Sequence, residues 1–237
     1  AEKARAEEQA RRDDQAFRTA DAAGTRDAFN TYLISFPNGR HAEEARERIA
    51  AIDARAAEED RIRVALTSLS ITMAPIPAGS FQMGSAEGDD DERPVRMVTC
   101  DAFSMSTTEI TQSQYRTVMS DNPSFHKLDD NCPVEQVTYN EAITFCNRLS
   151  EEVGLQPCYT VATGACDFSK NGFRLPTEAE WEYACRGNTG TEFNLGDGES
   201  ALSRAAWYTR NSQEKTHPVA QKTPNALGLY DMHGNVW

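Results

Sequence analysis

Six cysteines carry most of the potential reactivity of this 237-residue chain, at positions 100, 132, 146, 158, 166 and 185. Thiolates bind soft metals, form disulfides and act as nucleophiles. No pair has Cys-x-x-Cys spacing, which argues against a structural zinc site or a thioredoxin-like motif. Cys158 and Cys166 flank a short glycine-containing loop and could close a disulfide in an oxidising compartment. Buried free thiols are the alternative that we favour.

Acidic residues are the second chemical feature. The net charge is −13, and no basic run exceeds two residues, so we expect no nucleic-acid partner. Residues 87–92 contain five carboxylates. Such a run is typical of a solvated loop; calcium binding is the alternative, although the ordered spacing of an EF-hand loop is missing.

Three capping boxes predict the helices that must position these groups, at about 111–120, 139–153 and 178–186. Each helix begins with a threonine that is followed three residues later by Gln or Glu, a pattern that satisfies free N–H groups at a helix start. In the third helix, Trp181 and Cys185 lie four residues apart, so we expect a buried aromatic face opposite acidic Glu178 and Glu182. Strand-like segments at 75–85, 94–100 and 103–105, with long polar loops, predict an α+β domain with little regular structure.

The first 69 residues form a separate helical segment with a single proline and no cysteine or tryptophan. We expect a weakly amphipathic, largely solvated helix over 1–23, then a helical hairpin over 25–36 and 41–66. The hairpin resembles one unit of bacterial tetratricopeptide-like arrays. Because one unit cannot bury a core alone, a spacer or docking role is expected. No apolar run reaches the roughly 20 residues of a membrane span, and the first residues lack a signal-peptide h-region, which favours the cytoplasm.

Seven blocks in residues 74–237 resemble the formylglycine-generating enzyme, or sulfatase-modifying factor, family. The blocks are Gly79–Gly84, Glu92–Val95, Glu109–Tyr115, Asn122–Phe125, Pro133–Val137, Gly172–Arg186 and Asn225–Trp237. The resemblance implies a variant of the C-type lectin fold, and the wording of the blocks is similar to a broad bacterial branch that is often fused to protease, kinase or helical domains. We expect the domain at 74–237 to be incomplete at its C-terminal end.

The resemblance also implies metal sites. In the enzymes of the family, two cysteines near the C-terminus bind copper, and nothing before Trp237 matches that pair; copper would require cysteines beyond residue 237. One structural calcium is implied at Asp231, Gly234 and Val236, and a second, less complete site at Asn211 and Ser212. The alternative for Asp231 and Asn235 is that their side chains only cap a turn.

The favoured hypothesis is a non-catalytic module that binds a ligand or a protein, within a larger multidomain bacterial protein. No residue is assigned a catalytic role under this hypothesis. A protein partner or a fused upstream domain is expected. The competing hypothesis is a copper-dependent oxidase that converts a substrate cysteine to formylglycine, with its catalytic cysteines beyond residue 237.

Overall fold

The computed structural model describes residues 2–86 and 88–236, and the chain divides into two compact units, Ala1–Val64 and Ala65–Trp237. The boundary between the units lies within the helix Ala42–Ser68, five residues before the end of the helical segment 1–69 that the sequence predicts. Leu66, near the end of that helix, is buried in the second unit. No helix among the described residues is long and apolar enough to cross a membrane.

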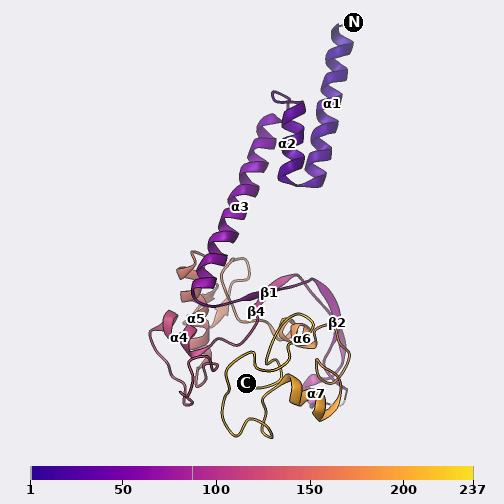
Figure 1. Cartoon of the computed structure of the whole chain (residues 1–237). Helices are drawn as coiled ribbons and strands as arrows, with labels where there is room; N and C mark the ends of the chain where they lie inside the picture. The colour runs from indigo at the N-terminus through magenta and orange to yellow at the C-terminus, as the bar shows by residue number, and fades with distance from the viewer. Residues whose placement is uncertain (1, 87, 237) are drawn as a thin grey trace. The chain divides into compact units, whose positions relative to one another are not determined.

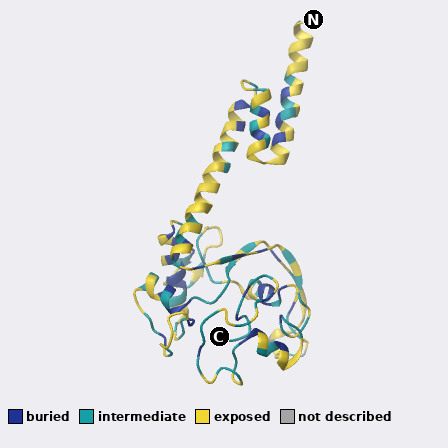
Figure 2. Cartoon of the chain, in the orientation of Figure 1, coloured by how far each residue is buried: buried dark blue, intermediate teal, exposed yellow. Residues whose placement is uncertain are grey.

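The first unit is built from α1 (Glu2–Ala23), α2 (Arg26–Ser35) and the greater part of α3 (Ala42–Ser68), as Figure 1 shows. The predicted hairpin of α2 and α3 is confirmed, and Thr25 caps α2 by accepting a hydrogen bond from the Ala28 N–H. Most of α3 is exposed (Figure 2). The first helix is less solvated than predicted, because Phe17 and Ala20 are buried against α2 and α3.

A buried carboxylate fixes the turn between α2 and α3. Asp13 is 5% exposed. Its Oδ1 accepts a hydrogen bond from the Tyr32 hydroxyl at 2.5 Å, and its Oδ2 accepts one from the Arg40 N–H at 2.7 Å. Burial and this hydrogen bond raise the pKa of Tyr32 to about 12. A buried charge needs such partners, so Asp13 ties α1 to the loop that follows α2.

The described residues of the second unit form three two-stranded antiparallel sheets. β1 (Met73–Ile76) pairs with β4 (Phe103–Ser106), β2 (Gly79–Met83) with β3 (Arg96–Cys100), and β5 (Tyr159–Thr160) with β6 (Ala165–Cys166). These strands and the helices below confirm the α+β class with little regular structure. The acidic run leads into a 3-10 turn at Asp90–Glu92, whose described side chains Asp90 and Glu92 are exposed, as is Asp89; residue 87 lies outside the described residues.

All three predicted capping boxes are present. They begin α4 (Gln112–Met119), α5 (Tyr139–Glu152) and α6 (Glu178–Arg186). A further helix, α7 (Gly198–Ala205), has no side-chain cap and was not predicted. Ser120 ends α4 in the left-handed conformation, which agrees with the predicted end of this helix at about residue 120.

The core of the second unit lies where β1, β3 and α6 meet the loop 225–236. Ile76, Cys100, Tyr183, Ala184 and Leu229 are buried together there, and Figure 2 shows buried residues along α6.

One buried amide holds that loop against α6. The Nδ2 of Asn225 donates to the carbonyls of Ala184 at 2.7 Å and Cys185 at 3.3 Å. Its Oδ1 accepts from the N–H groups of Leu227 and Leu229. The segment that follows is therefore fixed on the core without forming a helix or strand.

Candidate functional site

The candidate site is the loop 231–236, whose backbone adopts a conformation that few residue types favour. Asp231 and Asn235 have φ of +57° and +79°. Asp and Asn are the non-glycine residues that best tolerate this left-handed region. Gly234 closes a turn by donating its N–H to the Asp231 carbonyl at 3.2 Å. A Cβ at Gly234 would collide with the Trp207 carbonyl oxygen, so this position requires glycine.

The loop is braced by a neighbouring aromatic pair. The Asn235 N–H donates to the Trp207 carbonyl at 2.8 Å, and its side chain exchanges two hydrogen bonds with the backbone of His217, at 2.9 and 3.0 Å. The rings of Trp207 and His217 are stacked at 3.8 Å, and the Lys222 ammonium lies 3.8 Å from the Trp207 ring centroid. The side chain of Asn235 therefore joins the loop to the backbone of His217, and the alternative that Asp231 and Asn235 only cap a turn stays a prediction.

Within this braced loop, three oxygens are left without partners. Asp231 is 5% exposed; its Oδ2 accepts from the Ala220 N–H at 2.8 Å, but its Oδ1 has no hydrogen bond. Among the described residues, no hydrogen bond uses the carbonyls of Gly234 or Val236. Burial raises the pKa of Asp231, since desolvation disfavours the carboxylate. The donor set at these three residues fits a hard cation, which prefers carboxylate and carbonyl oxygens.

Asn211 and Ser212, the residues predicted to hold a second calcium ion, fit a cation less well. The Asn211 Oδ1 already accepts from the Tyr208 N–H at 2.8 Å, and its Nδ2 donates to the Ala206 carbonyl. The Ser212 carbonyl accepts from Nε2 of His217 at 2.8 Å. Both oxygens that would bind the ion are thus engaged in holding the chain, and a site at Asn211 and Ser212 stays a prediction.

Glu109 adjoins the loop and was not singled out from the sequence. Both of its carboxylate oxygens are buried, and neither has a hydrogen bond. Burial raises the pKa of Glu109 to about 8, with the negative charge of Asp231 as the second cause. The side-chain amide of Asn235 lowers the pKa of Glu109 and so offsets part of this rise. The Nδ2 of the same amide donates a hydrogen bond to the His217 carbonyl. Its place between the end of β4 at Ser106 and the helix cap at Thr111 is the only sequence signal for it.

Glu109, Asp231, Gly234 and Val236 all line one cavity of about 960 Å³. Aromatic side chains form much of its wall: Trp181, Trp207, Tyr208, Tyr230, His126 and His233. A cavity with an aromatic wall and a few convergent polar groups is the usual form of a ligand site.

The cysteines do not form a reactive site among the described residues. No cysteine lines this cavity, all six are free thiols, and only Cys166 is more than slightly exposed. Burial raises the pKa of Cys146 and of Cys185 to about 12. Cys185 lies 3.7 Å from Nε2 of His233, but that nitrogen accepts from the Asn194 N–H, so it does not draw a proton from the thiol. The donors present therefore do not fit copper(I), which requires thiolates.

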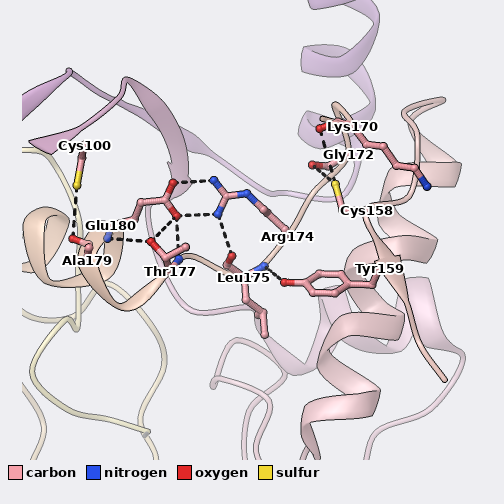
Figure 3. Close-up of polar contacts among 10 residues, drawn as sticks. All are labelled: Cys100, Cys158, Tyr159, Lys170, Gly172, Arg174, Leu175, Thr177, Ala179 and Glu180. Atoms are coloured by element: carbon pink, nitrogen blue, oxygen red, sulfur yellow. Dashed lines mark hydrogen bonds and ion pairs between the residues drawn. The ribbon is translucent and has the colours of Figure 1, made fainter. Parts of the chain in front are cut away.

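Cys158 and Cys166 lie at the small β5–β6 hairpin. Cys166 is paired with Tyr159, whereas the Cys158 carbonyl accepts from the Asp167 N–H, so the two cysteines are not opposite each other. The Cys158 thiol lies 3.2 Å from the Gly172 carbonyl (Figure 3). Both residues are thiols in the structure, and a disulfide between them stays a prediction for an oxidising compartment.

The stretch 172–186 has an architectural role. Arg174 makes a two-pronged ion pair with Glu180, at 2.6 and 2.7 Å, and Glu180 also completes the capping box with Thr177 (Figure 3). The Arg174 guanidinium is the main cause that lowers the pKa of Glu180 to about 2. The prediction that Trp181 is buried is wrong: it is 46% exposed, because the buried face of α6 is formed by Tyr183, Ala184 and Cys185.

Comparison with known proteins shows the family to which the second unit belongs. Residues 67–237 match the model of the sulfatase-modifying factor enzyme 1-like domain. The chain belongs to this family. The chaperone protein LppX of Paenibacillus barcinonensis is 33% identical, over 72% of this chain and 71% of its own length. The formylglycine-generating enzyme of Mycobacterium tuberculosis is 28% identical, over 70% of this chain and 72% of its own.

A solved structure confirms the fold. Treponema denticola variable protein 1 superposes with a TM-score of 0.65 at 35% identity, and the match covers 70% of each chain. Some relatives are much longer than the matched part. The chain spans 32% of the serine/threonine-protein kinase pkn1 of Chlamydia caviae, to which it is 30% identical over 86% of its own length. The family domain therefore occurs within larger proteins.

Proposed function

We propose that this chain is a non-catalytic binding module on a sulfatase-modifying-factor, lectin-like scaffold, and that its ligand or protein partner enters the aromatic cavity beside the loop 231–236. The observation that carries the proposal is the chemistry of that cavity: it has an aromatic wall and buried oxygens, and none of its described lining residues is a cysteine. The structural likeness to Treponema denticola variable protein 1, whose name assigns it no enzymatic activity, is compatible with this proposal.

An array of peptides and glycans tests this function directly. The wild-type chain should bind a subset of array members, and Thr108→Trp, which fills part of the cavity wall, should weaken that binding at least ~10-fold, equivalent to ~1.4 kcal/mol. Leu128→Trp, at an exposed position that does not line the cavity, is the control and should bind as the wild type does. Binding that is unchanged by Thr108→Trp would contradict a role for the cavity.

A calcium ion is the second part of the proposal, held by Asp231 Oδ1 and the carbonyls of Gly234 and Val236. The three free oxygens support it, since leaving a buried carboxylate oxygen unpaired is costly. A bound ion would fix the loop that forms one wall of the cavity. The residues Asn211 and Ser212 would, at most, support a second ion after a rearrangement of their hydrogen bonds.

Thermal unfolding with chelator and with calcium checks this part. At one hundred times its dissociation constant, a ligand of the folded state adds about 2.7 kcal/mol, which raises the melting temperature of a unit of this size by roughly 5–10 °C. Asp231→Ala should abolish the shift, whereas Asp101→Asn, an exposed carboxylate elsewhere, should retain it. An unchanged melting temperature of the wild type would exclude a structural calcium.

The competing proposal is a copper-dependent oxidase that makes formylglycine, and the similarity to the formylglycine-generating enzymes favours it. Its thiolates would have to come from outside this sequence, because five of the six cysteines are buried thiols with raised pKa values and none of the six lines the cavity. The full-length protein can be incubated with copper(I), oxygen and a Cys-x-Pro-x-Arg peptide. A lasting loss of mass at the peptide cysteine would overturn the non-catalytic proposal.

Attachment to a larger protein completes the proposal. The kinase relatives carry this domain as about a third of their length, which supports a fused domain or a protein partner here. The first unit, with a short core and a mostly exposed α3, would then act as a spacer or docking element. Cross-linking mass spectrometry of the full-length protein tests this role. Cross-links from the first unit to a partner or a fused domain would support docking, and their absence would contradict it.

A further inference from the structure

Trp181 is a large apolar side chain that the fold leaves outside the core. It is 46% exposed, whereas Tyr183, Ala184 and Cys185 form the buried face of the same helix. Among the described residues, its side chain has no stacked ring and no hydrogen bond. It lines the aromatic cavity. A tryptophan that packs little of the core but lines a cavity is typical of a binding site, because tryptophan is enriched among the residues that dominate binding energy.

Ion pairs hold both neighbours of Trp181 along α6. Glu180 accepts two hydrogen bonds from Arg174, at 2.6 and 2.7 Å (Figure 3). Glu182 accepts two from Arg186, at 2.6 and 2.8 Å. The backbone that carries Trp181 is therefore ordered before any ligand arrives, and a ligand that packs on this ring meets a preorganised surface.

Trp207, which also lines the cavity, cannot present its ring in the same way. The His217 ring is stacked on it at 3.8 Å, and the Lys222 ammonium lies over the ring at 3.8 Å from its centroid. Two groups this close to one ring centre must lie on opposite faces, so neither face of Trp207 is open to a ligand. Of these two tryptophans, Trp181 alone offers a free aromatic face to the cavity.

Several polar side chains of the cavity wall already have partners within the protein. The Tyr208 hydroxyl donates to Glu199 at 3.1 Å, and both ends of the Asn235 amide bond to the backbone of His217. The Nε2 of His233 accepts a backbone N–H at 3.1 Å. A sugar would bring many hydroxyl groups to this wall, and each one buried without a partner costs free energy. The free oxygens of the loop 231–236 are assigned to the proposed ion, so a ligand with few hydrogen-bond donors fits the cavity better.

We infer that the ligand of this cavity is a proline-rich peptide in the polyproline II conformation, and that one of its prolines packs on the ring of Trp181. The inference rests on the proposed function and names the ligand class of the same site. Proline has no N–H, and a polyproline II segment has no internal hydrogen bonds, so such a peptide brings few donors that need partners. Aromatic-lined grooves bind these segments, whose conformation is largely formed before binding. The indole N–H of Trp181 is free to donate to a carbonyl of the peptide.

Paired peptides on an array test the ligand class. One set contains the sequence Pro-x-x-Pro with varied residues at x, and each peptide has a partner with alanine at both proline positions. The wild-type chain should bind a subset of the proline set, and it should bind the alanine partners of that subset at least ~10-fold more weakly. Glycans on the same array provide the comparison with a different class of ligand.

Calorimetric titration with the tightest-binding proline peptide tests the role of Trp181. Trp181→Leu should weaken binding at least ~10-fold, because the aromatic face and the indole N–H are both lost. Trp181→Phe keeps an aromatic face and loses only the N–H, so a loss of ~5-fold is expected. Phe168→Leu is the matched control: Phe168 is 63% exposed but does not line the cavity, and this variant should bind as the wild type does. Thermal unfolding verifies that each variant is folded.

Quenching of tryptophan fluorescence by acrylamide is a second readout, which needs no replacement of Trp181. Bound peptide should shield the exposed ring and reduce the quenching of the wild type, and the reduction should be absent in Trp181→Phe. Quenching of the wild type that is unchanged by the peptide would overturn the inference even if Trp181→Leu fails to fold.

The remaining results separate the inference from the proposed function. Binding of glycans or of the alanine peptides in place of the proline set, weakened by Thr108→Trp, would overturn the inference and leave the cavity as a ligand site. Equal affinity of the wild type and Trp181→Leu for the proline peptide would overturn it as well. If Thr108→Trp weakens the binding of no array member, the proposed function fails and the inference fails with it.

Discussion

Replacement of Glu180 by glutamine removes one charge from the best-connected ion pair of the second unit. The pKa of Glu180 is lowered from 4.5 to about 2, mainly by the Arg174 guanidinium. At 1.36 kcal/mol per pKa unit, this shift of ~2.5 units sets a ceiling of ~3.4 kcal/mol. The two side chains are 24% and 16% exposed, so water screens part of the interaction, and a loss of ~2 kcal/mol is expected near neutral pH.

The pH dependence identifies the cause of that loss. A carboxylate with a lowered pKa stabilises the fold fully above its unfolded value of 4.5 and loses this contribution as the pH falls toward 2. The difference between wild type and Glu180→Gln, measured by urea unfolding, should therefore be ~2 kcal/mol at pH 7 and less than half of that at about pH 3. Glu178→Gln removes an exposed charge from the same helical turn and should cost less than ~1 kcal/mol.

Two results would refute this reasoning. A loss below ~0.5 kcal/mol at pH 7 would place the pair with ordinary surface ion pairs. A larger loss that is the same at pH 7 and at about pH 3 would assign the effect to packing, since packing does not depend on the charge of Glu180.

Three further predictions concern other parts of the chain. Tyr32→Phe should destabilise the first unit by ~1.5–3 kcal/mol, because Asp13 loses a buried partner; urea unfolding followed by circular dichroism measures this, with Tyr139→Phe as an exposed control. Gly172→Ala should lower the melting temperature, because a Cβ there would meet the Gln156 carbonyl, whereas Gly190→Ala has open space and should be neutral. In thiol titration with an aromatic disulfide reagent, Cys166 should react before the five buried cysteines; simultaneous reaction of all six would contradict the burial.

The sequence predicts most of the second unit where local chemistry decides the structure. Thr111, Thr138 and Thr177 begin the helices that their capping boxes indicate, because the cap bonds involve residues only three apart. The seven sequence blocks that resemble the family predict the fold of the whole domain, which local patterns alone do not. The assignment of Asp231, Gly234 and Val236 to a cation site also rests on a short loop with fixed residue types, and it stays a prediction.

Groups placed by distant contacts were not predictable. Trp181 was expected inside because it lies four residues from Cys185 on one helix face, but the packing of β1, β3 and Leu229 buries Tyr183 and Ala184 instead. Helix α7 begins at Gly198 without a side-chain cap, since the Asp197 carboxylate accepts from the Glu192 N–H instead. Asp13 and Glu109 are buried acidic residues, but their neighbours in the sequence are mostly polar. Nothing in the sequence therefore distinguishes them from acidic residues that are exposed to solvent.

The buried amide of Asn225 has a consequence for the dynamics of the chain. Two of its hydrogen bonds reach the carbonyls at the end of α6, and the other two hold the N–H groups of Leu227 and Leu229 in a segment without helix or strand. Amide protons of Leu227 and Leu229 should therefore exchange with deuterium as slowly as those of the core helix, because release requires the opening of the core rather than of a loop. These residues would therefore have the backbone chemical shifts of a coil and, at the same time, the slow hydrogen exchange of a folded core.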